Sequence, residues 1–476
     1  MSSGKHRSPA RRQVAIMLGG LVLVGGGAAA VMPVASAVDP VPWPAGVVYT
    51  TDLIAGQHTD VGSVSIKYDA TSVSVKTVVD TGQWCMTEVK AAAGPLTAFT
   101  NKPGNPVPGK FPLKQAYQPC VTDSGWLSMP KPAGWDYTVA VHATVTDLAS
   151  AVTTTISSEA GDRMYGPAAT PGALPGPVSA VQFPGNPAWA DVPGAKWIST
   201  ELPADIPVDP STGYVPDSYR KVVETFTVSG YLFGVTPLKA NSDNAEEVFL
   251  NATSIGSDGQ MAPGPVTDDQ KYKTVVDYPM ALKQGTNTLE IVFRNYGVPN
   301  LDPPYTAAQN PTGLAYHASY KVSQTETAWA AGAPWGGANW AMFVKLPSGT
   351  SVTVDSTVPE GVSMTLPGGT YFVVASGTWT NRINQGGEPV DASCTKESGG
   401  PWATQAVGFP DDLLELQINQ TDIDWGACAV PSHVYTTTWV GGITNLRIYD
   451  GENNQQIPGW FSDNQGDLTV VLYKIG

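Results

Sequence analysis

The chain has 476 residues, of which 50 are Gly and 41 are Pro, and only 14% are charged, against roughly 25% in ordinary soluble domains. So many helix-breaking residues argue against long helices, while a hydrophobic fraction of 42% excludes a disordered tract because it supplies ample apolar surface to bury. The net charge of −15 disfavours nucleic acid and anionic membranes as partners, since both are bound through Lys and Arg.

Residues 1–37 have the organisation of a secretory signal peptide. Four cations precede an uncharged run over residues 14–32, and a small-residue cleavage site follows at 35–37; the cations are Lys5, Arg7, Arg11 and Arg12. An uncleaved membrane anchor is the alternative, although many Gly and Ala residues lower the hydrophobicity of the run. Cleavage would leave 22 basic and 41 acidic residues, a net charge of −19. We expect a secreted or cell-surface protein with no membrane span after cleavage.

Four cysteines agree with export, because disulfides persist in oxidising compartments. They form two groups far apart in the sequence, Cys85 with Cys120 and Cys394 with Cys428, and each group encloses a loop of about 35 residues. Of the three connectivities that four cysteines allow, we expect pairing within each group, worth about 3–4 kcal/mol per bridge by loop entropy. No C-x-x-C spacing occurs, which argues against a zinc site.

The mature chain divides by composition into three modules of short strands, predicted as tandem jelly-roll-like β-sandwiches. The first, residues 38–165, alternates polar and apolar residues with period two, as in the segment 63–68. Residues 166–180 are rich in Pro and Gly and are predicted to form a linker. The second module spans residues 181–322 and the third 323–476, with strands expected at 288–293, 370–374 and 468–473.

The first two modules resemble families of exported proteins. In the first, the segments 53–57, 60–64 and 82–88 and the later Val141-His142-Ala143 resemble a repeat of secreted bacterial and archaeal surface proteins, which implies no function. In the second, the segments around Trp197, Asp243-Asn244 and 282–287 resemble a galactose-binding-like jelly roll. Modules of that family often bind glycans, and many are structural spacers.

From about Val362 onward, the third module resembles the calcium-dependent galactophilic lectins of bacteria. The segments that carry the resemblance are Gly377-Thr378-Trp379, 446–450 and 461–470. In those lectins an Asp after a strand, two amide residues in the next turn and backbone carbonyls hold an ion that coordinates sugar hydroxyls. The resemblance implies the following metal ligands here: the side chains of Asp450, Asp463 and Asn464, and the carbonyls of Asn381 and Trp460. Asp463 replaces an amide, and residues 451–459 form a longer insert than the lectins have.

Calcium prefers six to eight oxygen ligands, and a cluster of Asp and Asn on adjacent loops suits it chemically. Asp450, Asp463 and Asn464 meet the required number of ligands only in part. The alternative is that residues 463–466 form a hairpin turn, since tight turns select Asp, Asn and Gly. Sugar binding also uses aromatic faces, which makes Trp460 a candidate for carbohydrate contact together with Asp450 and Asn464. A place in the core is the alternative for Trp460, as it is for other tryptophans of this module.

Other candidates have structural explanations at the level of sequence. Trp379 and Trp402 fit a core better than a sugar platform, and the spacing of Trp329, Trp335 and Trp340 favours packing between the second and third modules. Asp243-Asn244 could hold an ion, but a turn into the next strand fits better. A glycan hydrolase would need two carboxyls roughly 5–10 Å apart. The candidate pairs are Asp411-Asp412, Asp422 with Asp424, and Glu246-Glu247.

These observations favour a secreted, non-catalytic protein that binds glycans or cell-surface polysaccharide through its C-terminal module, with Ca²⁺ as the expected ion. Two alternatives remain. One is a structural cell-envelope protein without a small ligand, and the other is a glycan hydrolase.

Overall fold

The computed structural model describes residues 40–476 apart from 102–103, 267–270, 336–339, 397–399, 405–413 and 453–454. The described residues form β-strands joined by turns and short 3-10 helices, and no α-helix occurs among them. The predicted all-β class is therefore confirmed. The expected signal segment, residues 1–37, lies outside the described residues. The chain divides into two compact units, one of residues 42–347 and the other containing residues 348–476.

The first unit begins with an antiparallel ten-stranded sheet, which we call the N-terminal module. Its strands are β1 Tyr49–Ala55, β2 Thr59–Tyr68, β3 Ser72–Val79, β4 Trp84–Ala93, β5 Leu113–Val121, β6 Leu127–Pro130, β7 Thr138–Asp147, β21 Thr325–Ala330, β22 Ala333–Pro334 and β23 Met342–Lys345. They follow the order β22-β23-β7-β21-β1-β2-β3-β6, and β4 pairs with both β7 and β5. The predicted alternation is seen in β2, where Val64, Ile66 and Tyr68 are buried.

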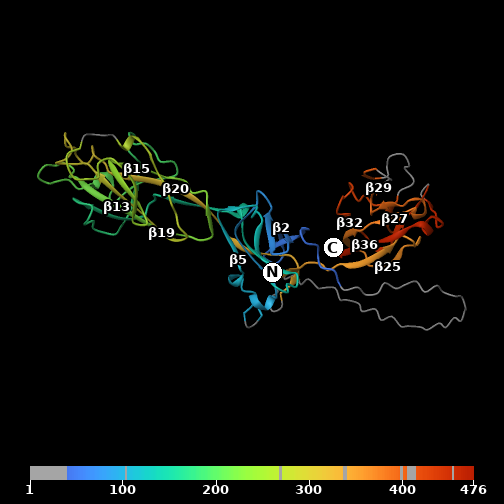
Figure 1. Ribbon diagram of the computed structural model, residues 1–476. Helices are drawn as coiled ribbons and strands as arrows, with labels where there is room; N and C mark the ends of the chain where they lie inside the picture. The colour runs from blue at the N-terminus through green and yellow to red at the C-terminus, as the bar shows by residue number, and fades with distance from the viewer. Residues whose placement is uncertain are drawn as a thin grey trace, which may run out of the picture. The chain divides into compact units, whose positions relative to one another are not determined.

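Two facing antiparallel sheets follow in the same unit and form the inserted module. Its strands are β8 Val152–Ser157, β9 Arg163–Ala168, β10 Val178–Ser179, β11 Val181–Phe183, β12 Trp197–Ser199, β13 Ser218–Val228, β14 Tyr231–Phe233, β15 Leu238–Asp243, β16 Ala245–Leu250, β17 Thr253–Asp258, β18 Val276–Tyr278, β19 Gly285–Asn295 and β20 Gly313–Ser323. One sheet has the order β10-β9-β13-β19-β16-β17, and the other β11-β12-β20-β15-β18 with β8 and β14 on β20 (Figure 1). Val222 and Ile291 of one sheet share a buried core with Leu314 and Tyr316 of the other.

The inserted module is joined to the N-terminal sheet by two chain segments. The chain leaves through β7 into β8 and returns through β20 into β21. These strands pair with each other on both sides of the junction, β7 with β21 and β8 with β20. At the junction, the hydroxyl of Ser323 donates a hydrogen bond to the carbonyl of Asp147. Residues 152–323 are therefore an insertion between two neighbouring strands of one sheet.

The segment 166–180 is predicted as a linker, but both of its ends form strands that pair within the inserted module. Its first residues complete β9, which pairs with β13, and residues 178–179 form β10. The register of β9 on β13 shifts between Tyr219 and Lys221, opposite Gly166 and Pro167. Gly166 has a φ of 110° there. Because bulges accommodate Gly and Pro within a sheet, the composition of this segment marks a β-bulge.

The predicted boundary at 322–323 also differs from the structure, because β21 and β23 return to the N-terminal sheet. Trp329 and Trp335, predicted to pack between the second and third modules, instead share a buried cluster with Phe111 of the N-terminal module. Trp340 stacks edge-on against Trp329 in the same place. A single sequence shows these aromatic residues but not which sheet the returning chain joins.

The second unit is the C-terminal module, a sandwich of an eight-stranded and a three-stranded sheet. Its strands are β24 Thr350–Asp355, β25 Val362–Leu366, β26 Thr370–Ser376, β27 Trp379–Asn381, β28 Glu388–Val390, β29 Thr395–Lys396, β30 Trp402–Ala403, β31 Glu415–Ile418, β32 Val434–Val440, β33 Ile443–Tyr449 and β36 Gln465–Lys474, with a small hairpin of β34 Gly451–Glu452 and β35 Gln455–Gln456. The large sheet has the order β30-β29-β28-β27-β36-β26-β32 with β24 on β36, and the small one β25-β33-β31.

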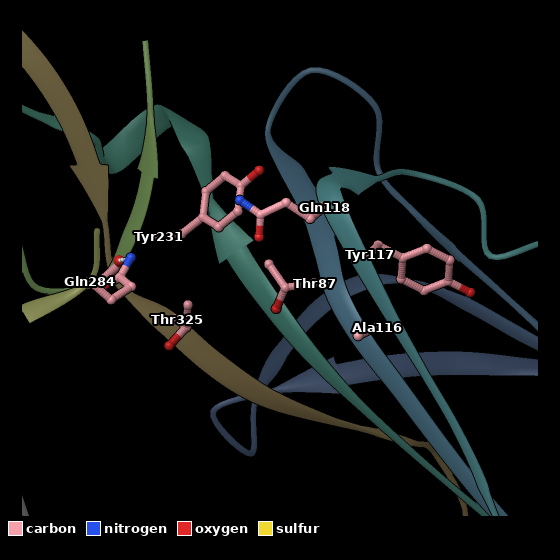
Figure 2. A pocket seen from close by; sticks show the side chains of 8 residues that line it. Thr87, Ala116, Tyr117, Gln118, Tyr231, Gln284 and Thr325 are labelled. Carbon is pink, nitrogen blue, oxygen red and sulfur yellow. Dashed lines mark hydrogen bonds between the residues drawn. The ribbon is translucent and has the colours of Figure 1, made fainter. Parts of the chain in front are cut away.

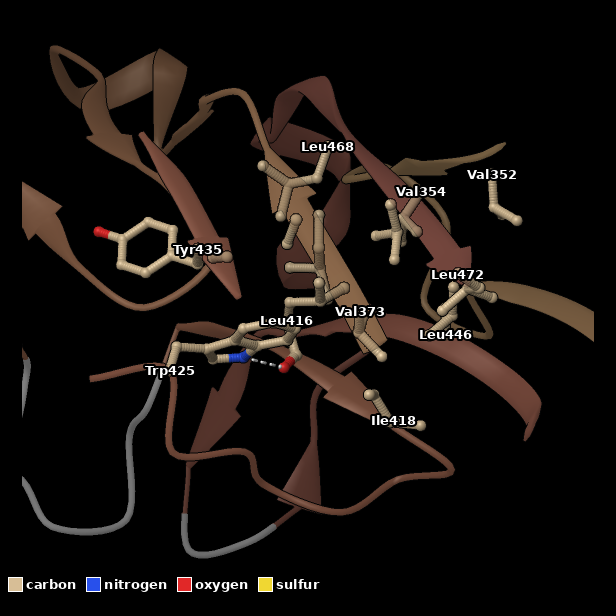
Figure 3. Packing of buried hydrophobic residues seen from close by; sticks show 14 of the residues in the cluster. Val352, Val354, Val373, Leu416, Ile418, Trp425, Tyr435, Leu446, Leu468 and Leu472 are labelled. Carbon is tan, nitrogen blue, oxygen red and sulfur yellow. Dashed lines mark hydrogen bonds between the residues drawn. The ribbon is translucent and has the colours of Figure 1, made fainter. Parts of the chain in front are cut away.

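Apolar side chains of both sheets fill the core of this module (Figure 3). Val373 and Leu472 come from the large sheet, and Leu416 and Leu446 from the small one. The indole nitrogen of Trp425 donates to the carbonyl of Leu416 at 2.9 Å, so the aromatic ring is fixed against the core while its polar atom is satisfied.

Both disulfides have the predicted pairing, Cys85 with Cys120 and Cys394 with Cys428. Each therefore closes a loop within one module. In the part of the chain that the structure describes, no helix is long and apolar enough to cross a membrane.

Candidate cation and carbohydrate site

Strand pairing in the C-terminal module brings the predicted ligands to one end of the sandwich. Asp450 directly follows β33, while Asp463 ends the 3-10 helix η7 (Trp460–Asp463) and Asn464 precedes β36. In the register of β27 on β36, Thr380 lies opposite Gln465, so Asn381 falls beside Asn464. All five predicted positions therefore belong to the ends of β27 and β33 and the segment that leads into β36.

Asp450 and Asn464 are in direct contact. The amide nitrogen Nδ2 of Asn464 donates to Oδ2 of Asp450 at 2.8 Å and to the carbonyl of Ser356 at 3.1 Å. Both partners accept hydrogen bonds, so they fix which end of the amide is nitrogen. The opposite atom, Oδ1 of Asn464, is buried and has no hydrogen-bond partner in the structure.

The environment of Asp450 is electrostatically unusual. Burial leaves Asp450 only 2% exposed and raises the pKa of its carboxyl above the ordinary value. The Asn464 hydrogen bond opposes that rise, the negative charge of Asp463 adds to it, and the positive charge of Arg382 opposes it. Asp463 and Arg382 are therefore both electrostatically coupled to Asp450. Residue chemistry alone did not single out Arg382, because its place depends on the pairing of β27 with β36.

The insert at 451–459 returns the chain to the site. It forms the hairpin of β34 and β35, and the backbone N–H of Ile457 donates to the carbonyl of Asp450 at 3.1 Å. The amide of Gln456 donates to the carbonyls of Pro359 and Ile448, which anchors the hairpin to the module. Trp460 follows with 36% of its surface exposed. Its ring is partly accessible to solvent, whereas Asn381 is buried.

The hairpin-turn alternative for residues 463–466 is wrong. Asp463 ends η7, while Gln465 and Gly466 already belong to β36 and pair with β27. The segment therefore leads from a 3-10 turn into a strand and does not join two strands of a hairpin.

The remaining candidates are explained by packing. Trp379 lies in the core, and Trp402 is half-buried with its ring 4.5 Å from that of His433. Asp243 and Asn244 join β15 to β16, in agreement with the predicted turn. They hydrogen-bond to each other, and Oδ1 of Asn244 accepts from the N–H of Tyr296.

The candidate carboxylate pairs that the structure describes have other hydrogen-bond partners. Glu246 is buried between Ser242 and Tyr278, while its neighbour Glu247 is bonded to Ser254 on the other strand face. Asp422 bonds Gln417, and Asp424 caps the turn at Gly426. Asp411 and Asp412 lie outside the described residues.

A different acidic group appears between the sheets of the inserted module. The hydroxyl of Tyr316 lies 2.8 Å from Oδ2 of Asp162 and 3.2 Å from Oε2 of Glu224. Burial raises the pKa of Glu224 to about 7, with further contributions from the charges of Asp162 and Glu159. No sequence pattern indicates this group, because Asp162 and Tyr316 are 154 residues apart.

A separate open pocket of about 480 Å³ lies in the first unit and contains none of the predicted site residues. Thr87, Ala116, Tyr117 and Gln118 line it from the N-terminal module, and Gly230, Tyr231, Gln284 and Thr325 complete it (Figure 2). The hydroxyl of Tyr231 is fixed by the backbone N–H of Cys120 at 2.9 Å. The residues that line it carry no carboxyl or imidazole group, so they offer neutral polar contacts.

No family model matches the chain, and no curated protein matches it. Solved structures to which it is similar include three α-L-rhamnosidases. The one from Streptomyces avermitilis has 12% identity and a TM-score of 0.19 over 90% of this chain and 36% of that enzyme. Those from Aspergillus terreus and Dictyoglumus thermophilum have 10% identity and TM-scores of 0.19 and 0.15, over 90% of this chain and 49% and 47% of the enzymes.

The chain thus spans a third to a half of the length of these enzymes. At such low TM-scores, the similarity carries no argument about activity or substrate.

Proposed function

We propose that this protein is a secreted or cell-surface carbohydrate-binding protein whose C-terminal module holds Ca²⁺ through Asp450, Asp463 and Asn464. The observation that carries the proposal is the buried, unpartnered Oδ1 of Asn464. Leaving a buried acceptor unsatisfied costs about 1–3 kcal/mol, and an amide oxygen is a ligand that calcium accepts. A cation beside Oδ1 would offset that cost.

The charges of the neighbouring groups support the same ion. Asp450 is buried, and Asp463 adds a second negative charge close enough to raise the pKa of Asp450. A bound cation would stabilise both carboxylates. The carbonyls of Asn381 and Trp460 are expected to add oxygen ligands, and calcium bound here would supply open coordination positions for sugar hydroxyls.

Trp460 supplies the second element of a sugar site. Its ring is exposed at the start of η7, three residues before Asp463, where the apolar face of a pyranose could stack while its hydroxyls reach the ion. Because the resemblance is to galactophilic lectins, galactosides are the first ligands to test. Export is supported by the N-terminal charge pattern and by two disulfides.

Calcium binding is tested by thermal unfolding of the full chain with calcium or with a chelator. At a hundred times the Kd, calcium should stabilise the C-terminal module by about 2.7 kcal/mol and raise its Tm by several degrees. Asp450→Asn should abolish this rise. The matched control is Asp467→Asn, which removes one exposed carboxylate from β36 and should leave the rise intact. Equal melting curves with calcium and chelator in the unmodified chain would contradict the proposal.

A further inference from the structure

The strand β32 is an exposed edge of the large sheet in the C-terminal module. Among the described residues it pairs with β26 and with no other strand. The seven pairs run without a bulge, from Val434 opposite Ser376 to Val440 opposite Thr370. Val434 and Val440 are 45% and 76% exposed.

β32 lacks the features that natural edge strands use against strand addition, namely charge, proline and bulges. Its sequence, Val-Tyr-Thr-Thr-Thr-Trp-Val, contains no charged residue and no proline. Several other edges in this protein are protected: β6 ends in Pro130, β17 in Asp258 and β24 in Asp355. The register of β25 is broken by a bulge. In a chain with a net charge of −15, β32 is thus a neutral edge of seven residues. The shorter edge strand β8 on β20, Val-Thr-Thr-Thr-Ile-Ser, is also uncharged, but its sequence does not read alike in both directions.

The backbone hydrogen bonds show which groups of β32 face outward. The N–H of Gly377 donates to the carbonyl of His433, and the N–H of Gly441 donates to the carbonyl of Gly369. Hydrogen-bonded positions alternate along an antiparallel pair. Because His433 and Gly441 are bonded to the chain of β26, the odd-numbered residues of β32 are the ones whose backbone groups bond to β26. The N–H and C=O groups of the remaining positions point away from the sheet; these are Val434, Thr436, Thr438 and Val440.

The sequence of β32 is symmetric about Thr437. Reversing the strand places Val434 on Val440, Tyr435 on Trp439 and Thr436 on Thr438. In an antiparallel pair of two copies with Thr437 on the two-fold axis, every outward-bonding residue therefore meets another outward-bonding residue. Valine lies opposite valine and threonine opposite threonine on the exposed face, while Tyr435 and Trp439 meet on the core-facing side. β-branched and aromatic cross-strand pairs of this kind are favourable.

We propose that this protein self-associates by pairing β32 antiparallel with β32 of a second copy, in the register centred on Thr437, so that the large sheets of two C-terminal modules become continuous. The occupant is a second copy because its matching edge has the required hydrogen-bonding pattern, and in reverse order it presents valine, aromatic and threonine side chains at the same positions. A single strand pair is small beside the roughly 1,200–2,000 Å² of stable interfaces, so the association is reversible and depends on concentration. This inference does not depend on calcium or sugar binding.

Sedimentation of the full chain over a hundredfold concentration range, with calcium chelated, tests this pairing. The unmodified chain should shift from monomer towards twice the monomer mass. The double variants T436K/T438K and T436E/T438E place like charges opposite each other in this register, and each should remain monomeric. S351K/T353K, the matched control, adds the same charges to β24 at the other edge of the sheet and should associate like the unmodified chain.

Mixing the two β32 variants tests the register itself. Each Lys of one chain then faces a Glu of the other, so an equimolar mixture should regain the dimer that neither variant forms alone. A variant that simply misfolds would not be rescued in this way. The proposal is overturned if the unmodified chain stays monomeric, if both β32 variants still dimerise, or if the mixture does not.

Discussion

At the scale of single residues, the candidate site is defined by the orientation of one amide. Asp450 and Ser356 both accept from Nδ2 of Asn464, and among the described residues no donor reaches the opposite atom, Oδ1. The sequence could name Asp450 and Asn464 as candidates because the segments that carry the lectin resemblance contain them. It could not predict Arg382, whose charge acts on Asp450 only through the fold.

Arg382 provides a prediction on affinity. Its positive charge opposes the rise in the pKa of Asp450, so it should also repel a cation beside that carboxylate. We expect Arg382→Ala to tighten calcium binding about fivefold at low ionic strength, since a partly screened charge interaction is worth about 1 kcal/mol. Calorimetric titration with calcium measures this change. Unchanged or weaker binding would place the ion away from Arg382, and added salt should shrink the difference.

Glu224 provides a prediction on pH. Its pKa is raised from 4.5 to about 7, so the folded state holds the proton more tightly than the unfolded state. The stabilisation from this group is therefore complete below pH 4.5 and is lost as the pH rises through 7. Glu224→Gln, which resembles the protonated form, should flatten the fall in the Tm of the inserted module over this window.

Glu290→Gln is the matched control for Glu224→Gln. Glu290 lies on the neighbouring strand β19 and pairs with Lys221 at the surface, so its replacement should leave the pH dependence as it is. If Glu224→Gln shows the same pH dependence as the unmodified chain, the raised pKa is not what couples the inserted module to pH.

At the scale of elements, the sequence predicted strands well and their partners poorly. The predicted strand 370–374 lies within β26, and 468–473 lies within β36. The alternation of apolar and polar residues in these strands is a local pattern, so it can be recognised from a few consecutive residues. The bulge at Gly166 depends instead on β13, more than fifty residues further along the chain, so its Gly and Pro looked like a linker.

Substitutions of two glycines, Gly166 and Gly172, distinguish a β-bulge from a linker in the segment 166–180. A Cβ on Gly166 would lie 2.6 Å from the carbonyl oxygen of Tyr219. An alanine at this position would also have to adopt a φ of 110°, which L-residues rarely do. Gly166→Ala should therefore destabilise the inserted module by about 1–3 kcal/mol in a denaturant titration. Gly172→Ala, in the same segment with open space around its Cβ, should change stability by no more than about 0.5 kcal/mol. Equal small effects would restore the linker interpretation.

At the scale of the whole molecule, the chain is built by insertion. β7 and β21 are neighbours in one sheet, yet residues 152–323 lie between them in the sequence. Composition could suggest separate β modules and the disulfide pairs, because Cys85 and Cys394 each have a partner nearby in the sequence. It could not show that β21 returns to the first sheet, since that pairing depends on tertiary contacts of Trp329.

A dimer formed through β32 would contain two copies of the proposed carbohydrate site. Two C-terminal modules joined through β32 would present two copies of the site at Asp450 and Asn464. Binding to a surface that carries many glycans gains strength when two sites engage together. Glycan binding and dimer formation remain separable, because the β32 variants leave the calcium ligands unchanged.

Retention of the full chain on immobilised galactose, with calcium and then with a chelator, tests calcium-dependent sugar binding most directly. The unmodified chain and Asp467→Asn should be retained with calcium and released by the chelator, while Asp450→Asn should pass through under both conditions. Passage of the unmodified chain with calcium present, or retention of Asp450→Asn, would contradict a galactose-binding calcium site at Asp450, Asp463 and Asn464.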